Sequence, residues 1–313
     1  SLPVLFILDG SNYFSFFKAL TEQWSSKKEM VLPEMIIVAI KQKNRSSELL
    51  HSYIQEDGIG ELFLDYIERE LIPSIDSTCN TYPHRTLFGH SRGGLFALNV
   101  LVDKPTLFDN YLVSDPNLTL GNLAFLKKWK GSDVNLNIDR NSLFIGLADT
   151  KEGNTLEEVL NPDSNIYPHM RTIWAICEEI ENNKSNDDYF DWKYYDGFGH
   201  KTIPPMVAMD GLLSVLEYHR FDKYALIYSH IDNKITYDQF KQSINDHFDI
   251  ISKRFGSTVL PYEHLIFDYG EVLHKERMAD QAVDMFKWNI KNFPESAQSK
   301  EKLKSINDTQ QSI

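Results

Sequence analysis

The sequence predicts an α/β protein with a doubly wound, mostly parallel sheet, followed by a small all-helical domain. Through the first 220 residues, apolar runs of strand length alternate with segments of helical periodicity. The run "PVLFIL" over 3–8 is apolar throughout, as expected of a strand buried on both faces, and "MIIVAI" over 35–40 is a second apolar run. Beyond Arg220 the strand-like runs stop, and Lys, Asp and Asn accumulate with helical spacing. We therefore expect one domain over residues 1–220 and a second over 221–313.

Strands and helices are expected to alternate along the first domain. The expected strands lie within the segments 3–8, 35–40, 85–88, 110–115, 142–149 and 190–200. The clearest helices are expected over 59–72, 92–103 and about 168–182. In the second of these, Leu95, Leu98 and Leu101 lie on one side of the helix. Strands separated by helices in this way are joined by crossovers, which favours parallel pairing.

The composition excludes several classes of partner. The 313 residues carry a formal net charge of −13, which argues against a nucleic acid or an anionic membrane as partner. No apolar run reaches the roughly 18 residues of a membrane-spanning helix. The opening segment lacks the basic start and cleavage site of a signal peptide, so cytoplasm and periplasm both stay open. Cys79 and Cys177 have no metal or redox spacing, and we expect plain thiols.

The stretch "LFGHSRGGLFAL" contains a candidate nucleophile. Gly89, Ser91 and Gly93 meet the pattern G-x-S-x-G between an expected strand and an expected helix. Small residues on either side allow the sharp turn that lifts a serine hydroxyl above the sheet edge. The N–H of Arg92, at the helix N-terminus, would face a developing oxyanion. We expect the side chain of His90 to point away from this site.

A serine nucleophile needs a base and usually an acid behind it. Triads built on such a turn follow the order Ser, acid, His, and His200 comes directly after the last expected strand. Asp149 ends the penultimate expected strand and is the first candidate for the acid. Glu152 and Asp163 are alternatives, as are Asp115 and a Ser–His dyad without an acid.

A second oxyanion donor is expected in the loop after the first strand. The N–H groups of Gly10 and Ser11 are the candidates there, and Asp9 is expected to hold that loop. Arg45 follows the second strand and would either bind a substrate carboxylate or fix the loop through an ion pair. Tyr13 is a candidate substrate contact for an apolar or aromatic group.

The helical part contains one repeat-like segment. Gly270, Ala282, Phe286 and Pro294 are separated by 12, 4 and 8 positions, which resembles one tetratricopeptide repeat. A single helical hairpin cannot bury its own apolar face. We therefore expect it to pack on the main domain, on the helices of 236–255, or on another subunit in a homodimer or other protein contact.

The chain resembles the putative esterase family of α/β-hydrolases, which includes enterochelin- and siderophore-esterase-like serine hydrolases. The resemblance rests on four segments between residues 3 and 205: "PVLFILDGSNYF", "IIVAIKQKNR", "LFGHSRGGLFALNVLVDKPTLFDNYLVSDPNL" and "GFGHKTIPP". It implies an α/β-hydrolase fold, Ser91 as nucleophile, His200 as base, and Gly10 and Arg92 near the oxyanion. It also implies a small carboxylic ester as substrate, with no cofactor and no metal.

Two features depart from that family. Its full sheet has four strands before the nucleophile strand, whereas two are visible here, so the N-terminal edge is expected to be missing or replaced. The stretch after "SLFIGLAD" lacks the short Gly-x-x-Glu/Asp turn common in the family, which leaves the acid open. The favoured function is a serine esterase that acts through an acyl-enzyme. An acyltransferase using the same site and an interaction protein working through its helices are the alternatives.

Overall fold

The computed structural model describes residues 1–26, 31–131, 141–183 and 189–310. The chain forms two compact units, Ser1–Glu217 and Tyr218–Ile313. None of the described helices combines the length and apolar character needed to cross a membrane.

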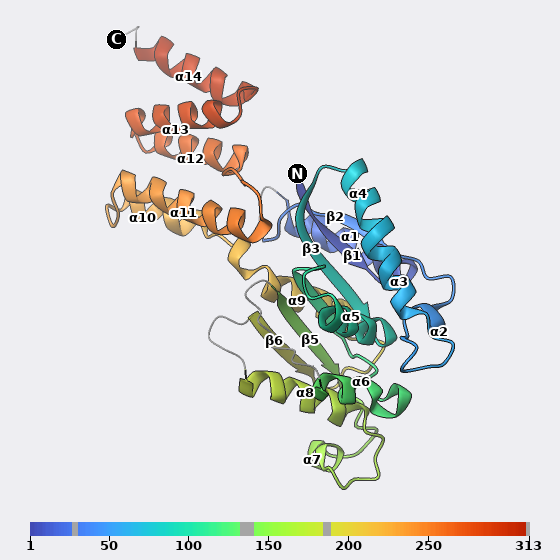
Figure 1. The fold of residues 1–313 in the computed structure, drawn as a ribbon. Helices are drawn as coiled ribbons and strands as arrows, with labels where there is room; N and C mark the ends of the chain where they lie inside the picture. The colour runs from blue at the N-terminus through green and yellow to red at the C-terminus, as the bar shows by residue number, and fades with distance from the viewer. Residues whose placement is uncertain (27–30, 132–140, 184–188, 311–313) are drawn as a thin grey trace. The chain divides into compact units, whose positions relative to one another are not determined.

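The first unit is built on a six-stranded sheet in which every neighbouring pair is parallel (Figure 1). The strands are β1 (Leu2–Ile7), β2 (Ile36–Ala39), β3 (Thr81–His90), β4 (Asn110–Ser114), β5 (Ser142–Ala148) and β6 (Tyr189–Tyr195). Their order in the sheet is β2-β1-β3-β4-β5-β6. The predicted doubly wound, mostly parallel sheet is therefore confirmed.

Helices cover both faces of this sheet. The helices are α1 (Gly10–Trp24), α2 (Arg45–Glu48), α3 (Gly60–Tyr66), α4 (Ile72–Thr78), α5 (Arg92–Asp103), α6 (Leu120–Gly131), α7 (Leu156–Leu160), α8 (His169–Asn183) and α9 (Pro204–Val215). On one face α1 contacts β1 and β2, and α9 contacts β4 and β5. On the other, α5 packs on β3 and β4, and α8 packs on β5 and β6. Successive side chains of the buried strands thus enter two different cores, as the period of two dictates.

Strand β1 illustrates this division. Val4, Phe6 and Leu8 belong to the core that includes α5 and α8. Leu5 and Ile7 alternate with them and are equally inaccessible to water. A strand that is buried on both faces must be apolar throughout, which explains the unbroken apolar run of β1.

The strand order places a topological switch point between β1 and β3. From β1 the chain moves outward to the edge strand β2, then returns to β3 on the other side of β1. Loops that leave the carboxyl ends of β1 and β3 therefore diverge and leave a crevice between them, where open α/β sheets bind ligands. Gly10 and Ser91 both lie at this edge, directly after β1 and β3.

Two local predictions need correction. The segment after β1, expected to be a loop, enters helix α1 at Gly10. The expected helix over 59–72 is instead α3 and α4 joined by a π-helical turn, Ile67–Leu71. By contrast, α5 spans Arg92–Asp103, the bounds that the periodicity predicts.

The second unit is all-helical, as predicted. Its helices are α10 (Lys223–Ile231), α11 (Tyr237–Phe255), α12 (Glu263–Lys275), α13 (Ala279–Asn292) and α14 (Ala297–Gln310). Helices α12 and α13 form a hairpin in which a Cβ on Gly270 would lie 2.6 Å from Cε1 of Phe286. The small residue thus permits the close approach of the two helices, while the assignment to the tetratricopeptide class stays a prediction.

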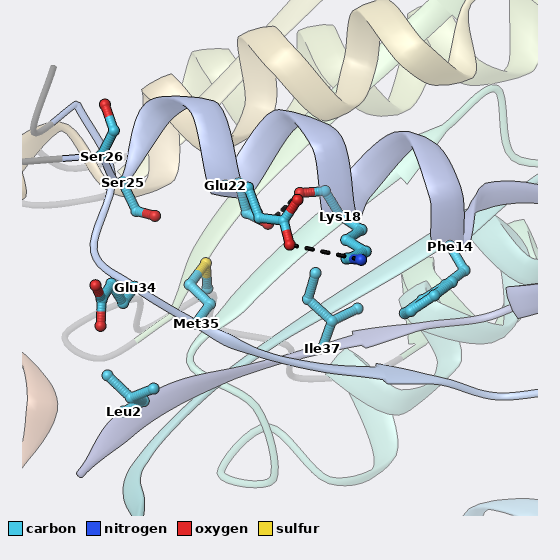
Figure 2. A pocket seen from close by; sticks show the side chains of 10 residues that line it. Leu2, Phe14, Lys18, Glu22, Ser25, Ser26, Glu34, Met35 and Ile37 are labelled. Carbon is cyan, nitrogen blue, oxygen red and sulfur yellow. Dashed lines mark hydrogen bonds and ion pairs between the residues drawn. The ribbon is translucent and has the colours of Figure 1, made fainter.

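A groove of about 540 Å³ runs between α1 and the edge strand β2. Figure 2 shows Phe14 and Lys18 on the helix side and Met35 and Ile37 on the strand side. Lys18 and Glu22 form an ion pair at its rim. The predicted nucleophile, base and acid are not among the residues that line this groove.

Candidate active site

Ser91 occupies the turn between β3 and α5. Its backbone has φ 58° and ψ −113°, a conformation that non-glycine residues rarely adopt. The turn is held by the N–H of Ser91, which donates to the carbonyl of Ser114 at 2.9 Å, and by the N–H of Asn117, which donates to the carbonyl of Ser91 at 3.0 Å. The predicted sharp strand-to-helix turn is present, with Ser91 in a strained conformation at its tip.

The two glycines of the motif have different steric roles. A Cβ on Gly89 would lie 2.1 Å from the carbonyl oxygen of Gly93, which no side chain can occupy. A Cβ on Gly93 would make only ordinary contacts, 3.5 Å from Asp9 and from Leu8. The turn therefore requires glycine at position 89 and merely accepts it at position 93.

Asp115 lies next to Ser91 at the edge of the sheet. His90 pairs in register with Ser114, so the residues that follow them emerge side by side from β3 and β4. Asp115 has φ 43°, and its side chain is completely buried. The backbone N–H of Ala148 donates to Oδ1 at 3.0 Å, which fixes one side of the carboxylate.

His200 reaches Asp115 from the turn that follows β6. Its Nδ1 lies 2.5 Å from Oδ2 of Asp115. Because a carboxylate only accepts, Nδ1 carries the proton of this hydrogen bond. In the neutral imidazole, Nε2 is then the nitrogen that can accept a proton. The ring of His200 also packs against that of His90, the neighbour of Ser91, with 4.4 Å between the ring centroids.

Hydrogen bonds from two histidines keep the carboxylate of Asp115 ionised. Burial alone would raise the pKa of this carboxyl, but hydrogen bonds from His169 and His200 outweigh that effect. The pKa of Asp115 is consequently held well below its usual range. An ionised carboxylate at this place orients the imidazole of His200 and stabilises its protonated form.

The prediction that His90 points away from the site is wrong. Its Nε2 lies 2.9 Å from the carbonyl oxygen of His200, and its Nδ1 lies 2.9 Å from the hydroxyl of Tyr13. Burial and the neighbouring His200 lower the pKa of His90 to about 4, so it is neutral at neutral pH. The carbonyl can only accept, so Nε2–H donates to it, and Nδ1 accepts from Tyr13. His90 thus ties α1 to the loop that carries His200.

The structure does not bring Asp149 to His200. Its Oδ2 accepts from the N–H of Gly197 at 2.9 Å, and its Oδ1 accepts from the N–H of Lys151 at 3.2 Å. Both hydrogen bonds, together with Lys151, lower the pKa of Asp149 against the opposing effect of burial. Strand β4 lies beside β3, whereas Asp149 follows β5, one strand further away. Asp149 therefore braces the turn before His200.

The other two acid candidates are exposed. Glu152 has φ 49° in the loop after β5, and its side chain faces solvent. Asp163 is also exposed, and its N–H donates to the side chain of Asn161 at 2.9 Å. The carboxylate hydrogen-bonded to His200 is that of Asp115, one of the alternatives that the sequence leaves open.

The three expected oxyanion donors differ in whether their N–H group is already hydrogen-bonded. The N–H of Gly10 donates to the carbonyl of Ile40 at 2.8 Å and is thereby engaged. A Cβ on Gly10 would lie 2.7 Å from the backbone of Ala39, so this glycine serves the close packing of α1 on β2. Ser11 and Arg92 lie in the first turns of α1 and α5, where N–H groups have no partner within their helix.

Arg45 and Tyr13 make internal contacts rather than pointing into open solvent. Arg45 donates from Nε to Oδ1 of Asp9 at 2.6 Å and from Nη2 to Oδ2 at 2.9 Å. Its Nη2 also lies 3.2 Å from the carbonyl oxygen of His90. This bidentate pair matches the loop-fixing alternative. Burial and the charge of Asp9 raise the pKa of Tyr13 to about 12, so its hydroxyl stays a donor.

One further residue, His169, joins the cluster and was not predicted. Its Nε2 lies 3.0 Å from Oδ2 of Asp115. The ligand atoms of Asp115, His169 and His200 all lie within 4.8 Å of one another, a donor set that divalent transition metals also use. Two ligands on one tetrahedral zinc ion stand about 3.3 Å apart, because Zn–N and Zn–O bonds are about 2.0–2.1 Å. The 2.5 Å between Asp115 and His200 fits a hydrogen bond better.

The chain is similar in sequence to proteins described as esterases. Residues 1–201 match the family model described as "Putative esterase". The chain is 40% identical over 74 residues to the ferri-bacillibactin esterase of Bacillus subtilis, a match that covers 23% of this chain and 26% of that protein. It is 35% identical over 75 residues to a siderophore triacetylfusarinine C esterase of Aspergillus fumigatus, with the same shares covered. The matched segments thus span about a quarter of these curated relatives.

The fold has a close structural counterpart over nearly the whole chain. An IroE-like serine hydrolase from Shewanella oneidensis superposes with a TM-score of 0.74 at 23% identity. The superposition covers 94% of this chain and 90% of that one. At this identity the likeness establishes the α/β-hydrolase fold.

Proposed function

Since the chain belongs to the putative esterase family of α/β-hydrolases, we propose that it hydrolyses small carboxylic esters through an acyl-enzyme on Ser91. The observation that carries the proposal is the hydrogen bond between Asp115 and His200, at the same sheet edge as the strained turn of Ser91. In the proposed mechanism Asp115 is the acid behind His200, and Nε2 of His200 is the basic atom.

In the first half-reaction, Oγ of Ser91 attacks the ester carbonyl carbon while Nε2 of His200 takes the hydroxyl proton. The carbonyl oxygen becomes an oxyanion, which we assign to the N–H groups of Arg92 and Ser11 at two helix N-termini. Asp115 stabilises the imidazolium that forms. The tetrahedral intermediate then collapses, and His200 returns the proton to the departing alkoxide.

The second half-reaction repeats these steps with water. His200 takes a proton from the water as its oxygen attacks the acyl carbon, and a second tetrahedral intermediate forms. Collapse expels Oγ of Ser91, which recovers its proton from His200, and the carboxylic acid leaves. No redox step occurs, and every proton that moves passes through one imidazole nitrogen.

Ester-linked siderophores are the substrate class that we propose to test first. The support is the local identity to the ferri-bacillibactin and triacetylfusarinine C esterases. A panel should therefore contain a tricatechol triester, a hydroxamate triester and short p-nitrophenyl esters. Faster hydrolysis of one siderophore class than of the simple esters would support this choice, and hydrolysis of simple esters alone would contradict it.

The serine mechanism has a direct test. The protein should release p-nitrophenol from short esters and be labelled by a fluorophosphonate on the peptide that contains Ser91. Ser91→Ala should abolish both signals while leaving the melting temperature close to that of the wild type. Unchanged hydrolysis by this variant would refute the proposal. Adding an alcohol acceptor separates the alternatives: free acid as the main product supports hydrolysis, and a new ester supports acyl transfer.

A further inference from the structure

The carboxylate oxygen that faces the base is shared by two imidazoles. Oδ2 of Asp115 lies 2.5 Å from Nδ1 of His200 and 3.0 Å from Nε2 of His169. His169 is the first residue of α8, so it reaches the site from a different element than His200. Its side chain is only 12% exposed, which limits competition from water for this hydrogen bond. We propose that His169 is a positioning residue, which holds Asp115 in the orientation that serves His200.

The hydrogen-bond chemistry fixes the protonation of this group. Ionised Asp115 has no proton to donate, so both facing nitrogens must carry one. His169 therefore takes the tautomer with a proton on Nε2, and His200 takes the one with a proton on Nδ1. The N–H of Ala148 donates to Oδ1. Together with the two imidazoles on Oδ2, it fixes the rotation of the carboxylate. Without His169, Oδ2 keeps a single donor among the described residues, and the carboxylate gains freedom to turn about its last bond.

A second effect is electrostatic. Each donor on Oδ2 withdraws charge from that oxygen, so the bond from His169 moderates the pull of Asp115 on the proton of His200. Removing it lets the carboxylate bind the imidazolium form of His200 more strongly. The base is then lost to protonation at a higher pH. The acid limb of the pH profile of kcat/KM should accordingly move upward.

The other titratable groups around His200 set the background for this effect. His90, from β3, packs on its ring and is neutral over the relevant pH range, since its pKa lies near 4. Tyr13, from α1, stays protonated and contacts His90. The charges of Asp9 and Arg45 lie beyond His90 and neutralise each other as an ion pair. None of these groups contacts Oδ2 of Asp115 in the described part of the chain.

The test compares three substitutions in the full chain. His169→Phe keeps a ring and removes the donor, whereas His169→Gln keeps an amide N–H at a comparable reach. His274→Gln, at an exposed position of the second unit, is the matched control. We expect His169→Phe to lower kcat at least tenfold with little change in KM. Its acid limb should move up by about half to one pH unit, the shift that one net hydrogen bond produces. His169→Gln should keep most of the wild-type kcat and an acid limb close to that of the wild type.

A profile of unchanged shape in His169→Phe, scaled only in height, would overturn the proposal. If that variant does not fold, nitrogen NMR on the wild type decides: His169 protonated on Nε2 supports the proposal, and protonation on Nδ1 overturns it. The inference rests on the proposed function, but the two can fail separately. Activity that survives Ser91→Ala removes the esterase mechanism, whereas the tautomer of His169 is measured without any substrate.

Discussion

The carboxylate of Asp115 lies 2.5 Å from Nδ1 of His200, although 85 positions separate the two residues in the chain. The parallel sheet brings them together. Asp115 leaves β4 next to Ser91, and His200 follows β6, so all three lie at the carboxyl edge. The geometry of this edge, rather than any local motif, therefore brings Asp115 to His200, the pair that we propose as catalytic.

The two motif glycines should differ in their tolerance of a side chain. Gly89→Ala places a methyl group 2.1 Å from the carbonyl oxygen of Gly93, so the free energy of unfolding should fall by about 3 kcal/mol or more. Gly93→Ala meets only ordinary contacts inside a helix and should change it by about 1 kcal/mol or less. Urea denaturation measures both. Equal losses in the two variants would contradict the assigned turn geometry.

His90 should make stability depend on pH. Its pKa is about 4 in the folded protein and near 6.5 in the unfolded chain, so the unfolded chain binds more protons between these values. His90 alone should therefore add about 3 kcal/mol to the free energy of unfolding between pH 4 and pH 6.5. In His90→Gln this contribution should be absent, whereas His274→Gln should keep it. Parallel curves for His90→Gln and the wild type would disprove burial of a neutral His90.

Arg45 should act on stability rather than on substrate choice. Arg45→Ala leaves the nearly buried carboxylate of Asp9 without its partner and should cost about 2 kcal/mol of unfolding free energy. Adding Asp9→Asn should recover part of that loss. KM should change by the same factor for esters with and without a carboxylate. A selective rise for the carboxylate-bearing ester would instead identify Arg45 as a substrate clamp.

Metal removal should leave hydrolysis unchanged. In the proposed mechanism Asp115 and His200 act through protons, and the separation of their facing atoms is that of a hydrogen bond. Dialysis against a chelator should keep kcat within error of the untreated protein. If activity fell and returned when zinc was added, the cluster with His169 would be a metal centre.

Much of the fold could be predicted because its signals are local. Strands buried on both faces require continuous apolar runs, and α5 shows the expected helical spacing. The start of helix α1 was not predicted because "DGSN" is typical of a turn. Gly10 nevertheless begins a helix there, and its lack of a side chain lets the chain approach β2 closely. The position of Ser91 on a strand-to-helix turn was predictable for the same reason: the small residues that it needs are its neighbours.

The carboxylate that contacts His200 could not be predicted because its place depends on strand order. Counting strands along the chain points to Asp149, which ends the penultimate strand. The sheet instead places β4 beside β3, so Asp115 is the carboxylate that emerges next to Ser91. His169 carries no signal at all, since its role arises only when the start of α8 reaches the end of β4.

The kcat of two matched variants, Asp115→Asn and Asp149→Asn, on one p-nitrophenyl ester decides which carboxylate acts with His200. Each replaces a carboxylate by an amide of the same size. Asp115→Asn should lower kcat by about 10³–10⁴-fold, because the imidazole loses both its tautomer and its counter-charge. Asp149→Asn should lower it by no more than about tenfold, the effect of one weakened hydrogen bond in the turn before His200. The reverse order would contradict Asp115 as the acid of this site.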